Sequence, residues 1–321
     1  MRPQILYLLR RILQIIPLVF AVVIVNFLLV HLAPGDPVYY LAGEAATLEY
    51  VQAMRKQLGL DRPVYEQLYL YALQVLRGDL GYSFVYGAPV STLILSRISA
   101  TLLLMAPAYV LFLVMGIFVG AISAKKRYSA FDHVVTIFSL VGYSMPTFWV
   151  GMVLLLVFSI SLGLFPVQGM VSLELELKGM QRFVDVLHHL FLPSLVLGVH
   201  NLAVTTRLAR GSTAEALTQD FIITARSKGV SETRVVLRHA LRNALLPVVT
   251  FTGMRLGTMI AGAVLTETVF GWPGLGRLLY DALYMRDYPV LLGMLLVLSV
   301  IVAISNLAVS YTHLTLPTNR E

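Results

Sequence analysis

The sequence predicts an all-α, polytopic membrane protein with six transmembrane helices, and its composition and patterning carry that prediction. Of its 321 residues, 58% are hydrophobic and only 13% are charged, whereas soluble domains carry about 25% charged residues. Apolar runs of about 20 residues, the length that crosses a bilayer, alternate with polar segments. The net charge of +7 is then explained by Lys and Arg kept on the cytoplasmic side. No basic tract interleaved with aromatic residues indicates nucleic-acid binding.

Several kinds of chemistry are excluded by the residues present. The chain has no cysteine, which excludes disulfides and thiolate metal sites. The adjacent His188 and His189 would point in different directions on a helix, and the seven histidines form no metal-binding spacing. No Gly-x-x-x-x-Gly-Lys-Ser/Thr sequence occurs, so the chain does not bind ATP through a P-loop. We expect no metal site and no catalytic residues.

Residues 1–97 are expected to form a first transmembrane helix plus an extracytoplasmic helical insert. The first span, 12–32, follows a basic start and predicts an N-terminus in the cytoplasm. A cleaved signal peptide is the alternative, but the apolar core is too long and no small-x-small cleavage site follows. Within the insert, 47–58 predicts a helix that ends at Gly59, and Pro63 predicts the start of another.

Residues 98–309 are expected to form a five-helix transmembrane core. Lys125, Lys126 and Arg127 directly follow its first span and indicate the cytoplasmic side. Prolines interrupt the spans, Pro107 and Pro146 among them, and predict either bends around a central path or plain packing kinks. The expected spans are 98–124, one within 134–162, 188–206, 245–265 and 290–309.

Arg255 lies within the fifth span, where a charge costs several kcal/mol unless it faces a wet cavity or a partner. One interpretation is an arginine that lines the translocation path and meets a substrate carboxylate. The other is an arginine that pairs with a neighbouring helix or reaches the interface. We keep both, and we take Arg255 and Pro146 as candidate path residues.

The most charged stretch of the chain runs from Thr213 to Pro247 and is interpreted as two short helices around a break. Gly229 suits the left-handed position that ends the first helix. Ser231 suits the N-cap of the second helix, and Pro247 is expected to turn the chain into the next span. Such a basic hairpin between two spans predicts a partner on the cytoplasmic side, although a solvated loop without a partner is the alternative.

This stretch resembles the coupling loop, here 207–245, of permease subunits of bacterial ABC importers in the dipeptide, oligopeptide and nickel branch. Ile223 and Thr224 replace the Glu and first Ala of the general permease pattern, a departure that is itself typical of the peptide branch. The matching residues are Phe221, Thr224, Ala225, Arg226, Lys228, Gly229, His239, Ala240, Asn243, Ala244, Leu246 and Pro247.

Two further blocks resemble the same branch in the same order. The first lies in the insert, at 34–37, 59–63 and 78–83, where it implies either a surface for a binding protein or a structural lid over the first helix. The second lies at 267–289 and implies an outer-face motif, with Trp272 anchored at the membrane interface. The residues of that motif are Trp272, Pro273, Gly274 and Gly276.

The resemblance implies a type I ABC importer permease fold and a membrane-spanning subunit of an ATP-driven importer for peptides or a related small solute. It further implies a second permease subunit, two cytoplasmic ATPase subunits, an extracytoplasmic substrate-binding protein and a lipid bilayer as partners. ATP and Mg would be bound by the partner ATPase, with no cofactor on this chain. The location implied is the bacterial inner membrane, with both termini in the cytoplasm.

The resemblance also assigns roles to residues of the coupling loop. Phe221 and Ile222 would anchor the loop in a groove of the ATPase, with Arg226 and Lys228 as charges at the rim. Gly229 would let the chain reverse. The full set of expected coupling residues is Asp220, Phe221, Ile222, Ala225, Arg226, Lys228 and Gly229.

Two other functional classes fit the sequence less well. A secondary transporter driven by an ion gradient usually carries acidic residues within its spans, and the six expected spans contain none. An intramembrane enzyme would need a polar catalytic pair at depth, and a purely structural subunit would not need the basic hairpin. Residues 310–321 follow the last span abruptly, and we expect a tail that is foreign to the protein or disordered, without a function.

Overall fold

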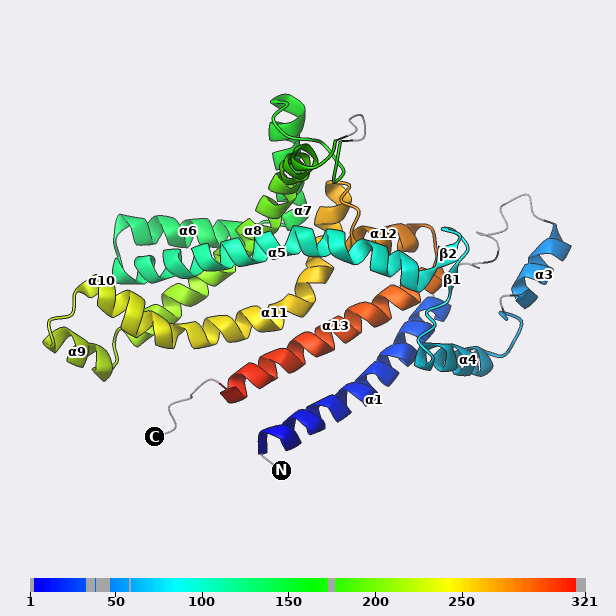
Figure 1. Cartoon of the computed structure of the whole chain (residues 1–321), viewed down its shortest axis with the longest axis horizontal. Helices are drawn as coiled ribbons and strands as arrows, with labels where there is room; N and C mark the ends of the chain where they lie inside the picture. Colours follow the sequence, from blue (N-terminus) through cyan, green and yellow to red (C-terminus); the bar gives the residue numbers. More distant parts are fainter. Residues whose placement is uncertain (1–2, 33–37, 39–46, 58, 173–176, 316–321) are drawn as a thin grey trace. The chain divides into compact units, whose positions relative to one another are not determined.

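The computed structural model describes residues 3–32, 38, 47–57, 59–172 and 177–315, and these are almost entirely helical (Figure 1). They divide into two compact units, one made of 1–99 with 274–321 and the other of 100–273. The expected all-α class is confirmed. The last two helices belong to the unit that contains the first helix, so the expected core of 98–309 is divided between the units.

The first unit contains the N-terminal helix and the insert. The insert helices begin and end as predicted, because Gly59 adopts a φ of +67° and Pro63 occupies the N-cap of the second insert helix. A two-stranded antiparallel hairpin, which was not predicted, pairs Ser83 with Ala88, and the expected block at 34–37 lies outside the described residues. The elements of this unit are α1 (Pro3–Leu32), α3 (Leu48–Gln57), α4 (Val64–Leu76), β1 (Tyr82–Ser83), β2 (Ala88–Pro89), the start of α5 (Val90–Lys125), α12 (Leu275–Tyr284) and α13 (Tyr288–Thr315).

The hydrophobic core of this unit lies where α5 begins, between α12 and α13. Val90 and Met294 are fully buried there. A Cβ added at Gly293 would lie 2.6 Å from a methyl group of Val90, so the glycine is what lets α13 approach. Farther along, α13 lies beside α1 (Figure 1).

The second unit is a helical bundle in which the long helix α8 packs along both α6 and α11. Two of its segments are π-helical, with i to i+5 hydrogen bonds. The elements are the remainder of α5, α6 (Ala130–Ser144), α7 (Thr147–Leu154), η1 (Leu155–Ser161), α8 (Met180–Ala216), α9 (Asp220–Ser227), α10 (Glu232–Arg234), η2 (Val235–Ala240) and α11 (Leu241–Val269).

Each of the six expected spans lies in helical structure, but the number six stays a prediction. Among the described residues, three helices are long and apolar enough to cross a membrane by length and composition, namely α5, α8 and α13. The pair α6 and α7–η1 makes a fourth if it is counted as one bent span. The other two expected spans fall in α1 and α11, which have 30 and 29 residues.

The prolines act differently from what the sequence suggested. Pro107 and Pro247 lie inside continuous helices, α5 and α11, so neither proline ends its helix; neighbouring helices can re-satisfy the freed backbone groups. The bend falls at Pro146 instead, where α6 and α7 meet at 100°. The preceding Met145 is extended, with φ −76° and ψ 130°, as a residue before proline prefers.

Two helix ends also differ from the prediction. The helix α8 begins at Met180, eight residues before the expected span of 188–206. The helix α13 continues to Thr315, so 310–315 are helical and not structureless. The remainder of the expected tail, 316–321, lies outside the described residues.

Candidate functional site

The helix α9 ends in the turn that the sequence predicted. Gly229 adopts a φ of +73°. The N–H of Gly229 donates to the carbonyl of Arg226 at 2.9 Å, and the N–H of Val230 donates to the carbonyl of Ala225 at 3.3 Å. These two bonds form a Schellman motif, which satisfies the last carbonyls of the helix. The chain therefore reverses through a defined turn and not through a loose loop.

An ion pair spans this turn. The guanidinium of Arg226 donates to Glu232 in α10 through Nη2 at 2.7 Å and through Nε at 3.2 Å. The hydrogen bond from Arg226 holds the pKa of Glu232 below its ordinary value, so the pair persists at neutral pH and is lost only as the pH falls through that lowered pKa. Both side chains are 46% exposed, and such surface pairs contribute about 0–1 kcal/mol. Arg226, expected as a rim charge for a partner, is thus already engaged within the hairpin.

The second helix of the hairpin is continuous with the span that follows it. Ser231 stands at the N-cap position as predicted, but its side chain makes no capping hydrogen bond. Its carbonyl instead accepts the N–H groups of Arg234 and Val235. From Glu232 the chain stays helical through η2 into α11. Unbroken helix therefore connects the turn to α11, so a movement of the turn also moves the start of α11.

The buried face of α9 fixes this helix against its own chain. Ile222 is 0% exposed and Ala225 is 6% exposed. The expected anchoring of a partner by Ile222 is therefore reassigned, because a fully covered side chain has no surface to offer. The residues that bury this face are Ala216, Val235, Ala240 and Ala244.

The outward face of α9 carries the accessible side chains. Phe221 is 38% exposed and Ile223 is 60% exposed, and Asp220 and Lys228 are exposed as well. Sequence reasoning missed Ile223 as a contact candidate. The spacing of Ile222 and Ala225, three residues apart, could have identified the buried face of the helix. Ile223, which lies off that face, would then have been predicted to be exposed.

Arg255 lies among polar and apolar side chains between helices of the same unit. Its guanidinium carbon is 5.6 Å from the ring centre of Phe251. A void of about 10 Å³ lies beside it, about the size that holds one water molecule. The lining mixes polar and apolar groups from α5, α8 and α11: Tyr109, Leu113, Asn201, Val204, Thr205, Phe251 and Thr252. This setting is compatible with both the path and the packing interpretation.

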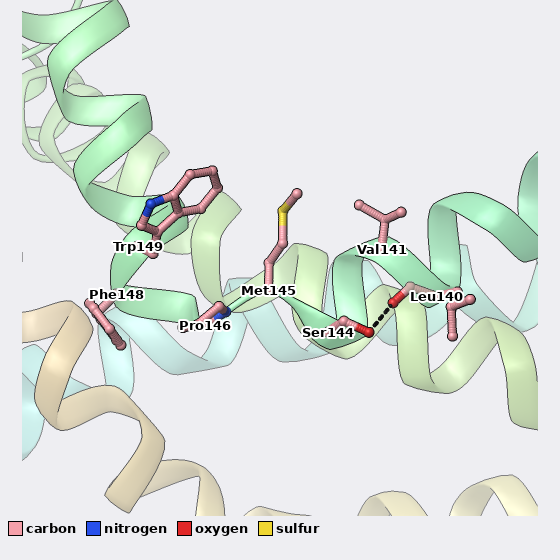
Figure 2. A pocket seen from close by; sticks show the side chains of 7 residues that line it. All are labelled: Leu140, Val141, Ser144, Met145, Pro146, Phe148 and Trp149. Carbon is pink, nitrogen blue, oxygen red and sulfur yellow. Dashed lines mark hydrogen bonds between the residues drawn. The ribbon is translucent and has the colours of Figure 1, made fainter.

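Pro146 lies elsewhere, in an open groove at the bend between α6 and α7 (Figure 2). The groove has a volume of about 560 Å³. The hydroxyl of Ser144 donates back to the carbonyl of Leu140 at 2.9 Å, so this polar side chain is used within its own helix. No charged side chain lines the groove, and Arg255 is not part of it. The lining residues are Leu140, Val141, Ser144, Met145, Pro146, Phe148 and Trp149.

The expected outer-face motif is a buried structural element in the residues described. Trp272 is 0% exposed and its indole N–H donates to the carbonyl of Ala100 at 2.8 Å, so the ring is held by the chain's own residues, and its place at the membrane interface stays a prediction. Glu267 is also fully buried and accepts the hydroxyl of Thr101 at 2.7 Å. Both contacts join the end of α11 and the following turn to α5. In the other unit, Gly274 and Gly276 are buried, and Pro273 is half-buried at the boundary.

The chain is similar to known proteins over nearly its whole length. Residues 116–313 match the family described as binding-protein-dependent transport system inner membrane component, and residues 4–105 match the N-terminal family of such membrane components. The chain is 42% identical to the dipeptide transport system permease protein DppB of Escherichia coli (strain K12), over 96% of each chain. It is 39% identical to the oligopeptide transport system permease protein AppB of Bacillus subtilis (strain 168), over 94% of each. It is 41% identical to the glutathione transport system permease protein GsiC of Escherichia coli O6:H1, over 96% of each.

Proposed function

This chain belongs to the family of binding-protein-dependent transport system inner membrane components, and from that premise we propose that it forms half of a translocation path for short peptides. It is the membrane subunit of an ATP-driven importer of the peptide branch, a transport component and not an enzyme. Among the relatives, the named substrates are dipeptides, oligopeptides and glutathione. Their shared peptide chemistry supports a peptide substrate here.

The proposal includes the assembly around the chain. Partners of two kinds follow from the family, an ATPase and a binding protein. We propose one further permease subunit and two ATPase subunits, with ATP and Mg bound by the ATPase. We also propose that both termini lie in the cytoplasm of an inner-membrane protein, since the Lys and Arg of 125–127 and 207–242 favour that side for the loops they occupy.

The proposed contact with the ATPase is the outward face of α9. The observation that carries it is the division of this helix into two faces: Ile222 and Ala225 are buried in the chain's own core, whereas Phe221 and Ile223 are exposed. A helix that is fixed from behind and shows apolar side chains outward suits a groove on a partner. Lys228, exposed at the end of the helix, supplies charge at the rim.

Affinity purification from the native membrane tests this contact. The wild-type chain is expected to retain an ATPase, and the double variant Phe221→Ala/Lys228→Ala is expected to lose it. The matched control is Phe131→Ala/Lys126→Ala, which removes an equally exposed phenylalanine, 39% against 38%, and a lysine from the turn between α5 and α6. An ATPase retained by the α9 variant would exclude this docking face. Uptake that proceeds without ATP would instead favour an ion-gradient mechanism.

Arg255 is proposed to meet the carboxylate of the peptide on the path. Arg255→Gln is expected to lower uptake of a dipeptide by about tenfold or more, since a hydrogen bond to a charged group contributes about 1.5–3 kcal/mol. Uptake of the C-terminal amide of the same dipeptide is expected to change little. Arg255→Lys, which keeps the charge, serves as the control. Equal losses for the acid and the amide, together with a less stable protein, would support the packing interpretation.

A further inference from the structure

The helices α5 and α8 are in unusually close contact along one seam. A Cβ added at Gly116 would lie 2.8 Å from Cβ of Thr205, and one added at Gly120 would lie 2.6 Å from the carbonyl oxygen of Thr206. These glycines stand four residues apart, on one face of α5. Small residues at such spacing let two helix backbones approach. At these two positions the contact leaves no room for a side chain on α5.

At the C-terminal end of α5 the seam is closed by an ion pair whose carboxylate is buried and whose arginine is partly exposed. Asp132, at the start of α6, is 1% exposed. Its carboxylate accepts Arg210 of α8 through Nε at 2.5 Å and through Nη2 at 2.7 Å. It also accepts the hydroxyl of Ser123 in α5 at 2.5 Å and the backbone N–H of Tyr128 at 3.0 Å. One carboxylate thus joins the end of α5, the following turn, α6 and α8.

A neighbouring face of the same part of α5 contacts the second half of the coupling hairpin. Ala121 is buried against Val236 and Leu241, which are 1% and 6% exposed. The ammonium of Lys125 donates to the hydroxyl of Thr233 in α10 at 2.8 Å. The last turns of α5 are therefore held on one face by α8, which leads into the hairpin, and on a neighbouring face by the helix that leads out of it.

We propose that Asp132 and Arg210 are positioning residues for coupling, which make α5, α6 and α8 move together when the ATPase displaces the hairpin. The inference rests on the proposed function. A bidentate arginine–carboxylate pair fixes both distance and orientation, which a glycine seam alone does not, because packed small residues can slide along one another. Without the pair, displacement of α9 would still reach α8 and α11, and α5 through its contacts with the hairpin, but α5, α6 and α8 would no longer be held in one fixed arrangement.

The test compares transport with ATP hydrolysis in the complete, reconstituted importer. Arg210→Lys keeps the positive charge but removes the bidentate geometry. We expect ATP hydrolysis by this variant to stay within about twofold of wild type, while the number of peptides transported per ATP falls by about fivefold or more. Arg277→Gln is the control, since it removes a partner from the exposed pair of Arg277 with Asp281 on α12, and its transport per ATP is expected to be unchanged.

A double-mutant cycle separates positioning from simple structural support. Asp132→Asn and Arg210→Gln should each lower transport per ATP, and the double variant should be no worse than either single change, because the two side chains act as one unit. Losses that add would overturn the proposal. So would a parallel fall in hydrolysis, transport and assembled yield, which indicates a structural role only. If the wild-type chain assembles with no ATPase, the proposed function itself fails, and this outcome is recognisable before any variant is measured.

Discussion

Replacement of Gly229 with valine is expected to reduce transport by about 5- to 30-fold, because a non-glycine residue in the left-handed region costs about 1–2 kcal/mol. Space is not the cause, since a Cβ at Gly229 would meet nothing within 4 Å. The cause is the φ of +73°, which a β-branched residue tolerates least. The Schellman turn would open into other geometries, and α9 would no longer be presented in one orientation. Hydrolysis and uptake in reconstituted vesicles are the measurements.

Two further variants make this result specific. Gly211→Val introduces the same side chain at a glycine of α8 that also has open space around it but lies within a regular helix, and transport should be unchanged. Gly229→Asn should recover much of the loss, because asparagine adopts left-handed backbone geometry more readily than other residues. Unchanged transport in Gly229→Val would show that the turn geometry is dispensable for coupling.

Replacement of Ile222 with alanine is expected to destabilise the hairpin by about 2–5 kcal/mol, the usual cost of emptying a filled core position. Ile222 is fully buried in a small cluster made mostly of alanines, which has few large side chains that could move into the space. The helix α9 should then separate from η2 and α11 in a larger fraction of molecules. Trypsin cleavage after Arg226 and Lys228, followed in detergent, reports this opening, and cleavage should become faster.

Ile223 supplies the matched comparison at the next position. Ile223→Ala removes the same atoms from a side chain that is 60% exposed, and surface changes of this kind usually stay within about 0.5 kcal/mol. Cleavage should therefore remain as slow as in wild type, although binding of the ATPase is expected to weaken. Equal cleavage rates in both variants would mean that the cluster around Ile222 does not hold α9 in place.

Local signals in the sequence were reliable wherever the backbone alone decides the structure. Gly59 and Gly229 both have positive φ, and Pro63 precedes α4, as their residue types indicated. The backbone conformation at these positions depends on which φ values the residue tolerates. It can therefore be predicted from the residue and its sequence neighbours. The helical class and the placement of the apolar runs followed from composition and length in the same way.

Predictions that depended on what packs against a residue were less successful. The burial of Trp272 was not predicted from its type, and its indole N–H is satisfied by the carbonyl of Ala100, 172 positions earlier in the chain. The partnership of Asp132 with Arg210 joins residues 78 positions apart, and no local pattern marks either as a member of a pair. Pro107 was expected to interrupt a helix that continues. Such features arise from tertiary contacts, which periodicity and propensity do not contain.

The separation of Asp132 and Arg210 along the sequence also has a consequence for the synthesis of the protein on the ribosome. Ribosomes add about 5–20 residues per second, so the arginine follows the aspartate, 78 positions earlier, after about 4–16 s. For most of that interval α5 and α6 are already complete, since α6 ends at Ser144, but the carboxylate of Asp132 has no guanidinium from which to accept a hydrogen bond. An ionised acid without a partner is costly away from water. In the newly synthesised hairpin of α5 and α6, Asp132 must therefore remain hydrated. This end of the bundle can pack only after α8 has been synthesised and Arg210 binds the carboxylate.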